Sequence, residues 1–260
     1  MTDLATPAAR PVIELSGFGK HYGDRLAVDG VTFSVPAGRI VGLVGPNGAG
    51  KTTTLRAIAG IHAPSAGTVR VAGFDVVREP VQAKRRLALV PDEPALFSSL
   101  TVWEHLEFTA RVYGVREWQG PALALLQELE LADRRGSLAD ELSRGMRQKV
   151  AVACALLHGP AALLFDEPLT GLDPRGIRTL YEAIRRRAAA GAAVLLSSHL
   201  LGQIESLCTG FAVMRQGRLL FAGTHDELRE RYAGAGGSLE EVFFHLTEGG
   251  DAPRPAAAAP

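Results

Sequence analysis

The sequence lacks several features that would assign the protein to a class at once. It has only two cysteines in 260 residues, and its acidic and basic residues balance at 28 each. This balance gives no overall field that would attract nucleic acid or an anionic membrane, so no nucleic-acid partner is expected. Cys154 and Cys208 lie far apart in apolar segments without C-x-x-C spacing, which is typical of buried free thiols in a reducing compartment.

The sequence also lacks an uninterrupted apolar run of the ~20 residues that a membrane-spanning helix needs. Its two longest weakly charged stretches, 150–165 and 188–204, are interrupted by His-Gly-Pro and by Ser-Ser-His. The first residues, MTDLATPAARP, include an acid and no apolar segment, so no secretory signal is expected. The 47% apolar content predicts an ordinary packed core. The free cysteines and the missing signal segment predict a cytoplasmic protein.

The pattern of apolar residues predicts an α/β protein. Short apolar runs divided by Gly-Asp-Arg and Asp-Gly over 12–35 predict an antiparallel sheet with tight turns. Residues 100–157 carry helical spacing and predict a helical insert. Before the insert, RIVGLVG, GTVRVAG and ALV are predicted as strands. After it, strands alternate with helices as in a mainly parallel sheet; they are AALLF, AAVLLSS and FAVMRQGRLLFAG.

The two ends of the chain differ from this middle part. We expect a flexible arm over 1–11, a folded domain over 12–233 with its helical part at about 100–157, and a C-terminal helix over 234–250. The helix prediction rests on SLEEVFFHLTE, in which a serine can cap the first turn. Residues 251–260, DAPRPAAAAP, are expected to be a disordered tail.

A glycine-rich stretch, GPNGAGKTT, fits the pattern G-x-x-x-x-G-K-[ST] and lies between a predicted strand and a predicted helix. Such a loop turns backbone N–H groups toward phosphates, and the helix N-terminus adds the positive end of a dipole. Lys51 is expected to reach the β- and γ-phosphates, and Thr52 to hold Mg²⁺. A turn that only caps a helix would not need the Lys-Thr pair. The expected phosphate-binding residues are Gly45, Pro46, Asn47, Gly48, Ala49, Gly50, Lys51, Thr52 and Thr53.

Two adjacent acids follow a second apolar strand in AALLFDEP. Neighbouring side chains at a strand end point in different directions, so Asp166 can hold Mg²⁺ while Glu167 polarises an attacking water. The alternative is a solvated turn before Pro168. No N-K-x-D motif for reading guanine is present, and no acceptor site or lid of a small-molecule kinase is evident. ATP hydrolysis is therefore the favoured chemistry.

Three further motifs accompany the glycine-rich stretch and the acidic pair. LSRGM lies upstream of the acids, GLDP follows just after them, and SSH ends the next strand. With them, 12–231 resembles the ATP-binding cassette (ABC) ATPases, most closely the cassettes that export drugs or other small molecules. The resemblance implies a P-loop NTPase fold: a RecA-like mixed sheet core, an antiparallel β subdomain and a helical subdomain carrying the signature LSRGM.

The resemblance implies that Ser143 and Gly145 contact the γ-phosphate of ATP bound by a second cassette, and that Asp173 touches this partner. Ser143 lies at a predicted helix N-cap, where free N–H groups favour an anion. One domain does not need two anion sites for one phosphate, which indicates two cassettes closing face to face. A plain serine cap is the alternative. Arg144 and Met146 depart from the Gly and Gln common in the family.

Three more positions follow from the resemblance. Tyr22 would stack on adenine, with a turn aromatic packed on the sheet as the alternative. His199 would bridge the γ-phosphate and the attacking water, whereas most single histidines are surface or core residues. Asp92 stands where the family usually has Gln, and it can bind near Mg²⁺ but cannot donate a hydrogen bond; the alternative is a plain strand-end turn.

The implied partners are a second cassette, expected to be an identical copy, and a separate membrane permease, since this chain shows no spanning segment of its own. The protein would then lie on the inner face of the cell membrane, docked through the region of 92–101, and would use ATP to power solute movement, with export favoured. Other possibilities are a non-transport ABC ATPase acting in translation or DNA maintenance, and a catalytically silent subunit.

Overall fold

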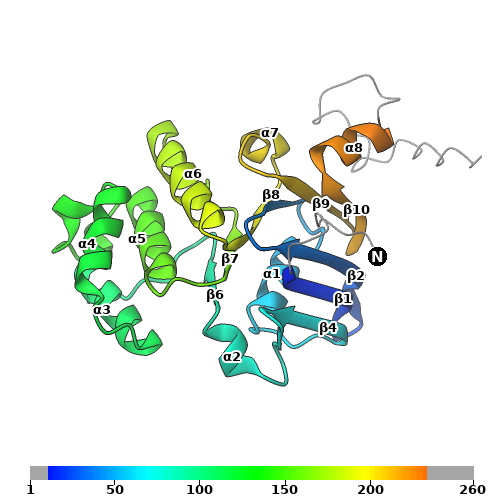
Figure 1. Ribbon diagram of the computed structural model, residues 1–260, viewed down its shortest axis with the longest axis horizontal. Coiled ribbons are helices and arrows are strands. Elements are labelled where there is room, and N and C mark those ends of the chain that lie inside the picture. The colour runs from blue at the N-terminus through cyan, green and yellow to red at the C-terminus, as the bar shows by residue number, and fades with distance from the viewer. Residues whose placement is uncertain (1–10, 233–260) are drawn as a thin grey trace, which may run out of the picture.

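The computed structural model describes residues 11–232, which form two β-sheets and several helices (Figure 1). The expected C-terminal helix and tail, together with residues 1–10 of the expected arm, lie outside the described residues, whereas Pro11 already belongs to the first strand. Within 11–232, no helix has both the length and the apolar character to cross a bilayer.

The smaller sheet is antiparallel throughout. Ile13 and Leu15 pair with Val35 and Phe33 across the first hairpin, and all four are at most 2% exposed. These alternate residues share one face, which gives the sheet its buried side. The strands in spatial order are β2 (Arg25–Pro36), β1 (Pro11–Tyr22), β4 (Ala66–Val71) and β5 (Phe74–Asp75).

The larger sheet is mixed, because five parallel strands carry one antiparallel strand at an edge. Parallel strands covered on both faces consist of nearly continuous apolar residues, which is why RIVGLVG and AALLF predict buried strands. The strands in spatial order are β10 (Arg218–Thr224), β9 (Gly210–Arg215), β3 (Ile40–Val44), β8 (Ala193–Ser198), β7 (Ala162–Asp166) and β6 (Leu87–Val90).

Helices cover both faces of the larger sheet. Leu164 of β7 packs in the core that contains α1, whereas Leu163 and Phe165 pack in the core that contains α6. Because α1 also contacts β2 and β4, it lies between the two sheets. The helices outside the insert are α1 (Lys51–Ile58), α2 (Pro80–Lys84), α6 (Pro174–Ala189), α7 (Leu201–Ile204) and α8 (His225–Tyr232).

A group of three helices stands to one side of the sheets, drawn in green in Figure 1. They are α3 (Val102–Tyr113), α4 (Gln119–Glu128) and α5 (Arg144–Leu157), with short 3-10 turns at Ala132–Arg134 and Ala139–Glu141. Thr101 begins α3 with a capping box, since it accepts from the Glu104 N–H and its own N–H donates to the Glu104 carboxylate. The predicted fold class, with a mixed core, an antiparallel sheet and a helical part, is confirmed. Our exact domain boundaries remain predictions.

The parallel strands place three sequence motifs at one edge of the larger sheet. In the ladder, Val44 of β3 pairs with Ser198 of β8, and Asp166 of β7 pairs with Ser197. The chain therefore leaves the sheet at the same edge before the glycine-rich loop, at Glu167 and at His199. Carboxyl ends of parallel strands are where α/β folds assemble their functional sites.

Candidate functional site

The glycine-rich loop joins β3 to α1, and glycine is needed there for two different reasons. Gly50, the residue before α1, has φ of +102°, in the left-handed region that favours glycine. A Cβ added to Gly45 would collide with the carbonyl oxygen of Met214 on β9. The loop therefore closes tightly over the sheet and continues directly into the helix N-terminus, the arrangement that presents backbone N–H groups to an anion.

Lys51 is the first residue of α1, and its side chain curls back over the loop. It is 7% exposed, and its Nζ donates to the carbonyl oxygens of Gly45 at 2.7 Å and Pro46 at 3.3 Å. The same Nζ lies 3.9 Å from Glu167 Oε1. Burial lowers the pKa of the Lys51 ammonium, and the carboxylates of Glu167 and Asp166 oppose that shift.

Asp166 ends β7 as a nearly buried carboxylate, 8% exposed. Its Oδ1 accepts two hydroxyl hydrogen bonds, one from Ser197 Oγ at 2.6 Å and one from Thr52 Oγ1 at 3.2 Å. The structure thus brings together two of the three residues that the sequence predicts as metal ligands, Thr52 and Asp166. Ser197 is a residue that sequence reasoning missed. Its only signal was a polar side chain near the end of an otherwise apolar strand, two positions before His199.

Glu167 follows immediately and holds an unusual backbone conformation. Its φ of +46° is rare for a residue with a long side chain, and such positions cluster at functional sites. Its N–H donates to Ser197 Oγ at 3.0 Å, and its Oε2 lies 3.0 Å from His199 Nδ1. Two of the three predicted catalytic residues, Lys51 and His199, therefore contact opposite oxygens of the third.

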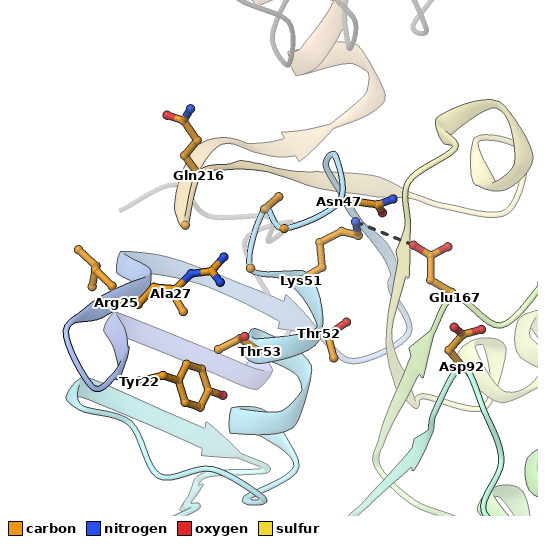
Figure 2. A pocket seen from close by; sticks show the side chains of 15 residues that line it. Tyr22, Arg25, Ala27, Asn47, Lys51, Thr52, Thr53, Asp92, Glu167 and Gln216 are labelled. Atoms are coloured by element: carbon orange, nitrogen blue, oxygen red, sulfur yellow. Dashed lines mark ion pairs between the residues drawn. The ribbon is translucent and has the colours of Figure 1, made fainter.

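Lys51, Thr52 and Glu167 line an open cleft with a volume of about 730 Å³ (Figure 2). Tyr22, which is 43% exposed, lies at one side of it, and its ring meets the His62 ring edge-on with centroids 5.7 Å apart. The cleft thus offers an aromatic face at one end and an ammonium with carboxylates at the other. Its lining residues predicted from the sequence are Tyr22, Asn47, Gly48, Ala49, Gly50, Lys51, Thr52, Thr53, Asp92 and Glu167.

Sequence reasoning missed the part of the lining that comes from two hairpins. Arg25, Leu26 and Ala27 belong to the first hairpin, and Gln216 and Gly217 form the turn between β9 and β10. Hairpin residues of this kind carry no motif, so only the packing of the small sheet against the β9–β10 hairpin could reveal them. Gly45 and Pro46, the first two residues of the loop, are not part of the cleft lining and instead contribute carbonyl groups to Lys51.

The residues expected to act on a second molecule lie apart from this lining. Ser143 caps α5, where its Oγ accepts from the Met146 N–H at 3.3 Å. Asp173 caps α6 and accepts from the Gly176 N–H at 2.7 Å. A Cβ placed on Gly145 would lie 3.0 Å from the carbonyl oxygen of Gly171, so the start of α5 packs against the turn that leads into α6. Ser143, Gly145 and Asp173 therefore belong to one surface region outside the cleft.

Asp92 lies in the cleft lining, but its carboxylate already has a partner. Arg144 Nη2 donates to Asp92 Oδ1 at 3.3 Å. Both side chains are about half exposed, at 46% and 45%. Asp92 is therefore brought near the predicted metal ligands, and the structure adds an ion pair that the sequence did not predict.

Comparisons with known proteins show what this chain is similar to. The family model described as "ABC transporter" matches residues 28–170. The chain is 37% identical over 220 residues to the ABC-type transporter ATP-binding protein EcsA of Bacillus subtilis, covering 84% of this chain and 89% of that protein. It is 38% identical over 218 residues to the Nod factor export ATP-binding protein I of Paraburkholderia xenovorans, covering 83% and 72%.

A solved structure described as the ATP-binding subunit of an ABC transporter superposes with a TM-score of 0.86 at 36% identity. The superposition covers 90% of this chain and 99% of that one. Its extent shows that the whole described fold, and not the glycine-rich loop alone, is shared. The chain belongs to the ABC transporter family, as an ATP-binding cassette that hydrolyses ATP to power transport.

Proposed function

We propose that ATP is hydrolysed in the cleft by in-line attack of a water that Glu167 activates as general base. The observation that carries this proposal is the convergence of Lys51 and His199 on the two oxygens of Glu167, beside the glycine-rich loop. His199 orients the Glu167 carboxylate and lies where it can also contact the γ-phosphate. Lys51 and the loop N–H groups stabilise the charge that develops on the phosphate oxygens.

Thr52 and Asp166 fit a magnesium site, and we propose them as its protein ligands. Mg²⁺ favours oxygen ligands and is commonly held by one or two protein groups together with substrate phosphates. The Thr52 hydroxyl and the Asp166 carboxylate already lie 3.2 Å apart at the cleft. Bound there, the ion would neutralise charge on the phosphates. A ligand role for Asp92 remains a prediction, because its carboxylate is paired with Arg144.

The adenine is proposed to stack on Tyr22, whose half-exposed ring borders the cleft. The first hairpin would then hold the base, while the glycine-rich loop holds the phosphates. Tyr22 and the glycine-rich loop belong to the lining of one cleft, so a single nucleotide could contact both.

A second cassette is proposed to complete the site. Ser143 and Gly145 lie at the start of α5 but outside the cleft of their own chain, so a nucleotide that they contact must be held by another molecule. The Ser143 hydroxyl and the first N–H groups of this 14-residue helix would then face the partner's γ-phosphate. Asp173, at the start of α6, would meet the partner next to this region. We propose a homodimer that closes on ATP and opens after hydrolysis.

The work is proposed to be done on a separate membrane permease, with this chain on the inner face of the cell membrane. The region after β6 offers a fitting surface: Phe97 and Phe108 are 53% and 48% exposed, with ring centroids 5.4 Å apart. Exposed aromatic pairs of this kind suit a protein interface. Export is the proposed direction, because one relative is named for the export of Nod factor.

The base role is tested by Glu167→Gln, with the exposed Glu182→Gln as the matched control. The amide keeps the size of the side chain but cannot take a proton from water, so turnover should be abolished while ATP still binds and stabilises a dimer. Hydrolysis rates and ATP-dependent dimerisation measured by size-exclusion chromatography give the result. Unchanged hydrolysis by Glu167→Gln would remove this residue from the base role.

The action of the signature on a second molecule is tested by Ser143→Arg. The isolated monomer should still bind ATP, because Ser143 does not line its own cleft, whereas hydrolysis should be impaired. ATP affinity and turnover are measured on the same preparation. A loss of ATP binding by the monomer would place Ser143 in the pocket of its own chain and contradict the two-cassette site.

A further inference from the structure

Two residues that depart from the ABC family pattern face each other in the structure. Asp92 stands where that pattern has a neutral Gln, and Arg144 stands where it has Gly; here the two positions carry opposite charges. They are 52 positions apart in sequence, yet Arg144 Nη2 lies 3.3 Å from Asp92 Oδ1. One belongs to the loop after β6 and the other is the first residue of α5. The two departures therefore form one structural feature.

The side chain of Arg144 is guided toward Asp92 by the loop that precedes α6. A Cβ added to Gly171 would lie 2.9 Å from Arg144 Cδ and 3.2 Å from its Nε. Gly171 also has φ of +79°, which a residue with a side chain rarely adopts. Glycine at this position thus leaves room for the aliphatic part of Arg144 to cross the loop. The guanidinium is placed by packing as well as by charge.

The charge of Asp92 matters because of what surrounds it. It lines the same cleft as Glu167, and Asp166 stands beside Thr52 at that cleft, so three carboxylates gather where a triphosphate must bind. Lys51 interacts electrostatically with two of them, Glu167 and Asp166. A third carboxylate without a counter-ion would repel a polyanionic ligand, because like charges in one cleft repel each other even where water partly screens them.

We propose that Arg144 is the counter-ion of Asp92, and that this pair permits an acidic residue in the cleft without loss of ATP affinity. The inference rests on the proposed function, because it takes ATP as the ligand of the cleft. Arg144 acts as a positioning residue: it neutralises Asp92 and, as the first residue of α5, fixes the start of the signature helix relative to the nucleotide cleft of its own chain.

The test compares Asp92→Asn, Arg144→Gln and the double variant, each with a non-hydrolysable ATP analogue, so that the bound nucleotide persists and Glu167 keeps its charge. ATP dissociation constants are measured by calorimetry on the full chain at low ionic strength. Arg144→Gln leaves the Asp92 carboxylate unpaired and should weaken binding roughly 2- to 5-fold, the range expected for a half-exposed pair. Asp92→Asn should tighten binding by up to a similar factor, and the double variant should return to within about twofold of the starting protein.

The controls separate a charge effect from a folding effect. Asp133→Asn and Arg134→Gln remove exposed charges from the 3-10 turn of the helical insert, and neither should change ATP affinity. Arg144→Lys keeps the cation and should bind ATP more like the starting protein than Arg144→Gln does. At about 0.5 M salt the differences should shrink, because surface charges are then screened over a few ångströms. Thermal unfolding of each variant verifies that it is folded.

Two results would overturn the inference. If Asp92→Asn weakened ATP binding with magnesium present but not with EDTA, Asp92 would be a metal ligand rather than the partner of Arg144. If neither single substitution changed the affinity, the ion pair would have no part in nucleotide binding, while the proposed function would still stand. A starting protein that did not bind ATP would instead contradict the proposed function itself.

Discussion

Replacing Ser197 by alanine tests how the acidic centre of the site is held. The fully buried Ser197 hydroxyl donates to Asp166 and accepts from the Glu167 N–H, so the substitution removes two hydrogen bonds at once. A bond to a charged group contributes about 1.5–3 kcal/mol and one to a neutral amide about 1 kcal/mol. We therefore expect the free energy of unfolding to fall by about 2–4 kcal/mol, which lowers Tm by roughly 4–16 °C in a domain of this size.

The same substitution should impair the chemistry. Asp166 loses the hydroxyl that fixes its Oδ1, and Glu167 loses the anchor of its strained backbone, so both carboxylates become less well placed. We expect kcat to fall roughly 10- to 100-fold, the effect of a small misplacement of reacting groups. The Mg²⁺ concentration for half-maximal hydrolysis should rise as well. Thermal unfolding and steady-state hydrolysis at varied Mg²⁺ measure these quantities.

Ser198→Ala is the matched control, because the Ser198 hydroxyl hydrogen-bonds to the backbone of Leu200 and, within residues 11–232, to neither acid. The loss of these two neutral hydrogen bonds should cost about 2 kcal/mol of stability and leave the Mg²⁺ dependence unchanged. If Ser197→Ala hydrolysed ATP at the original rate with the original Mg²⁺ requirement, the hydroxyl would not be positioning the carboxylates. Other contacts would then have to hold the Asp166 and Glu167 carboxylates in place.

Two further predictions concern buried titratable groups. Burial lowers the pKa of His158 in the folded protein, so the unfolded chain binds its proton first as the pH falls below about 6.5. The free energy of unfolding, measured by chemical denaturation, should therefore decrease between pH 7 and pH 5.5. The decrease should be smaller for His158→Gln, and an equal decrease in the two proteins would contradict this prediction. Burial also raises the thiol pKa values, that of Cys154 to about 11 and that of Cys208 still further. Both thiols should react with Ellman's reagent at pH 8 only after unfolding, and rapid labelling of the native protein would show that they are accessible.

Much of the fold and the centre of the site could be predicted from sequence because they depend on neighbouring residues. The buried parallel strands consist of continuous apolar residues, and the glycine-rich loop carries its own conformational requirements at Gly45 and Gly50. Asp166 and Glu167 are placed by the strand that precedes them. The family resemblance implied a role for His199 beside the attacking water, and its Nδ1 lies 3.0 Å from Glu167 Oε2.

Other features arose only from tertiary packing. Ser197 holds both acids because β8 lies next to β7 in one particular register, and Gln216 reaches the cleft because the β9–β10 hairpin packs beside the first hairpin. The pairing of Asp92 with Arg144 depends on how the helical insert rests against the sheet. The sequence by itself determined which chemical groups the protein possesses and which strand or helix end carries each. The distances between groups on separate elements were decided by packing, since no local pattern records which segments become neighbours.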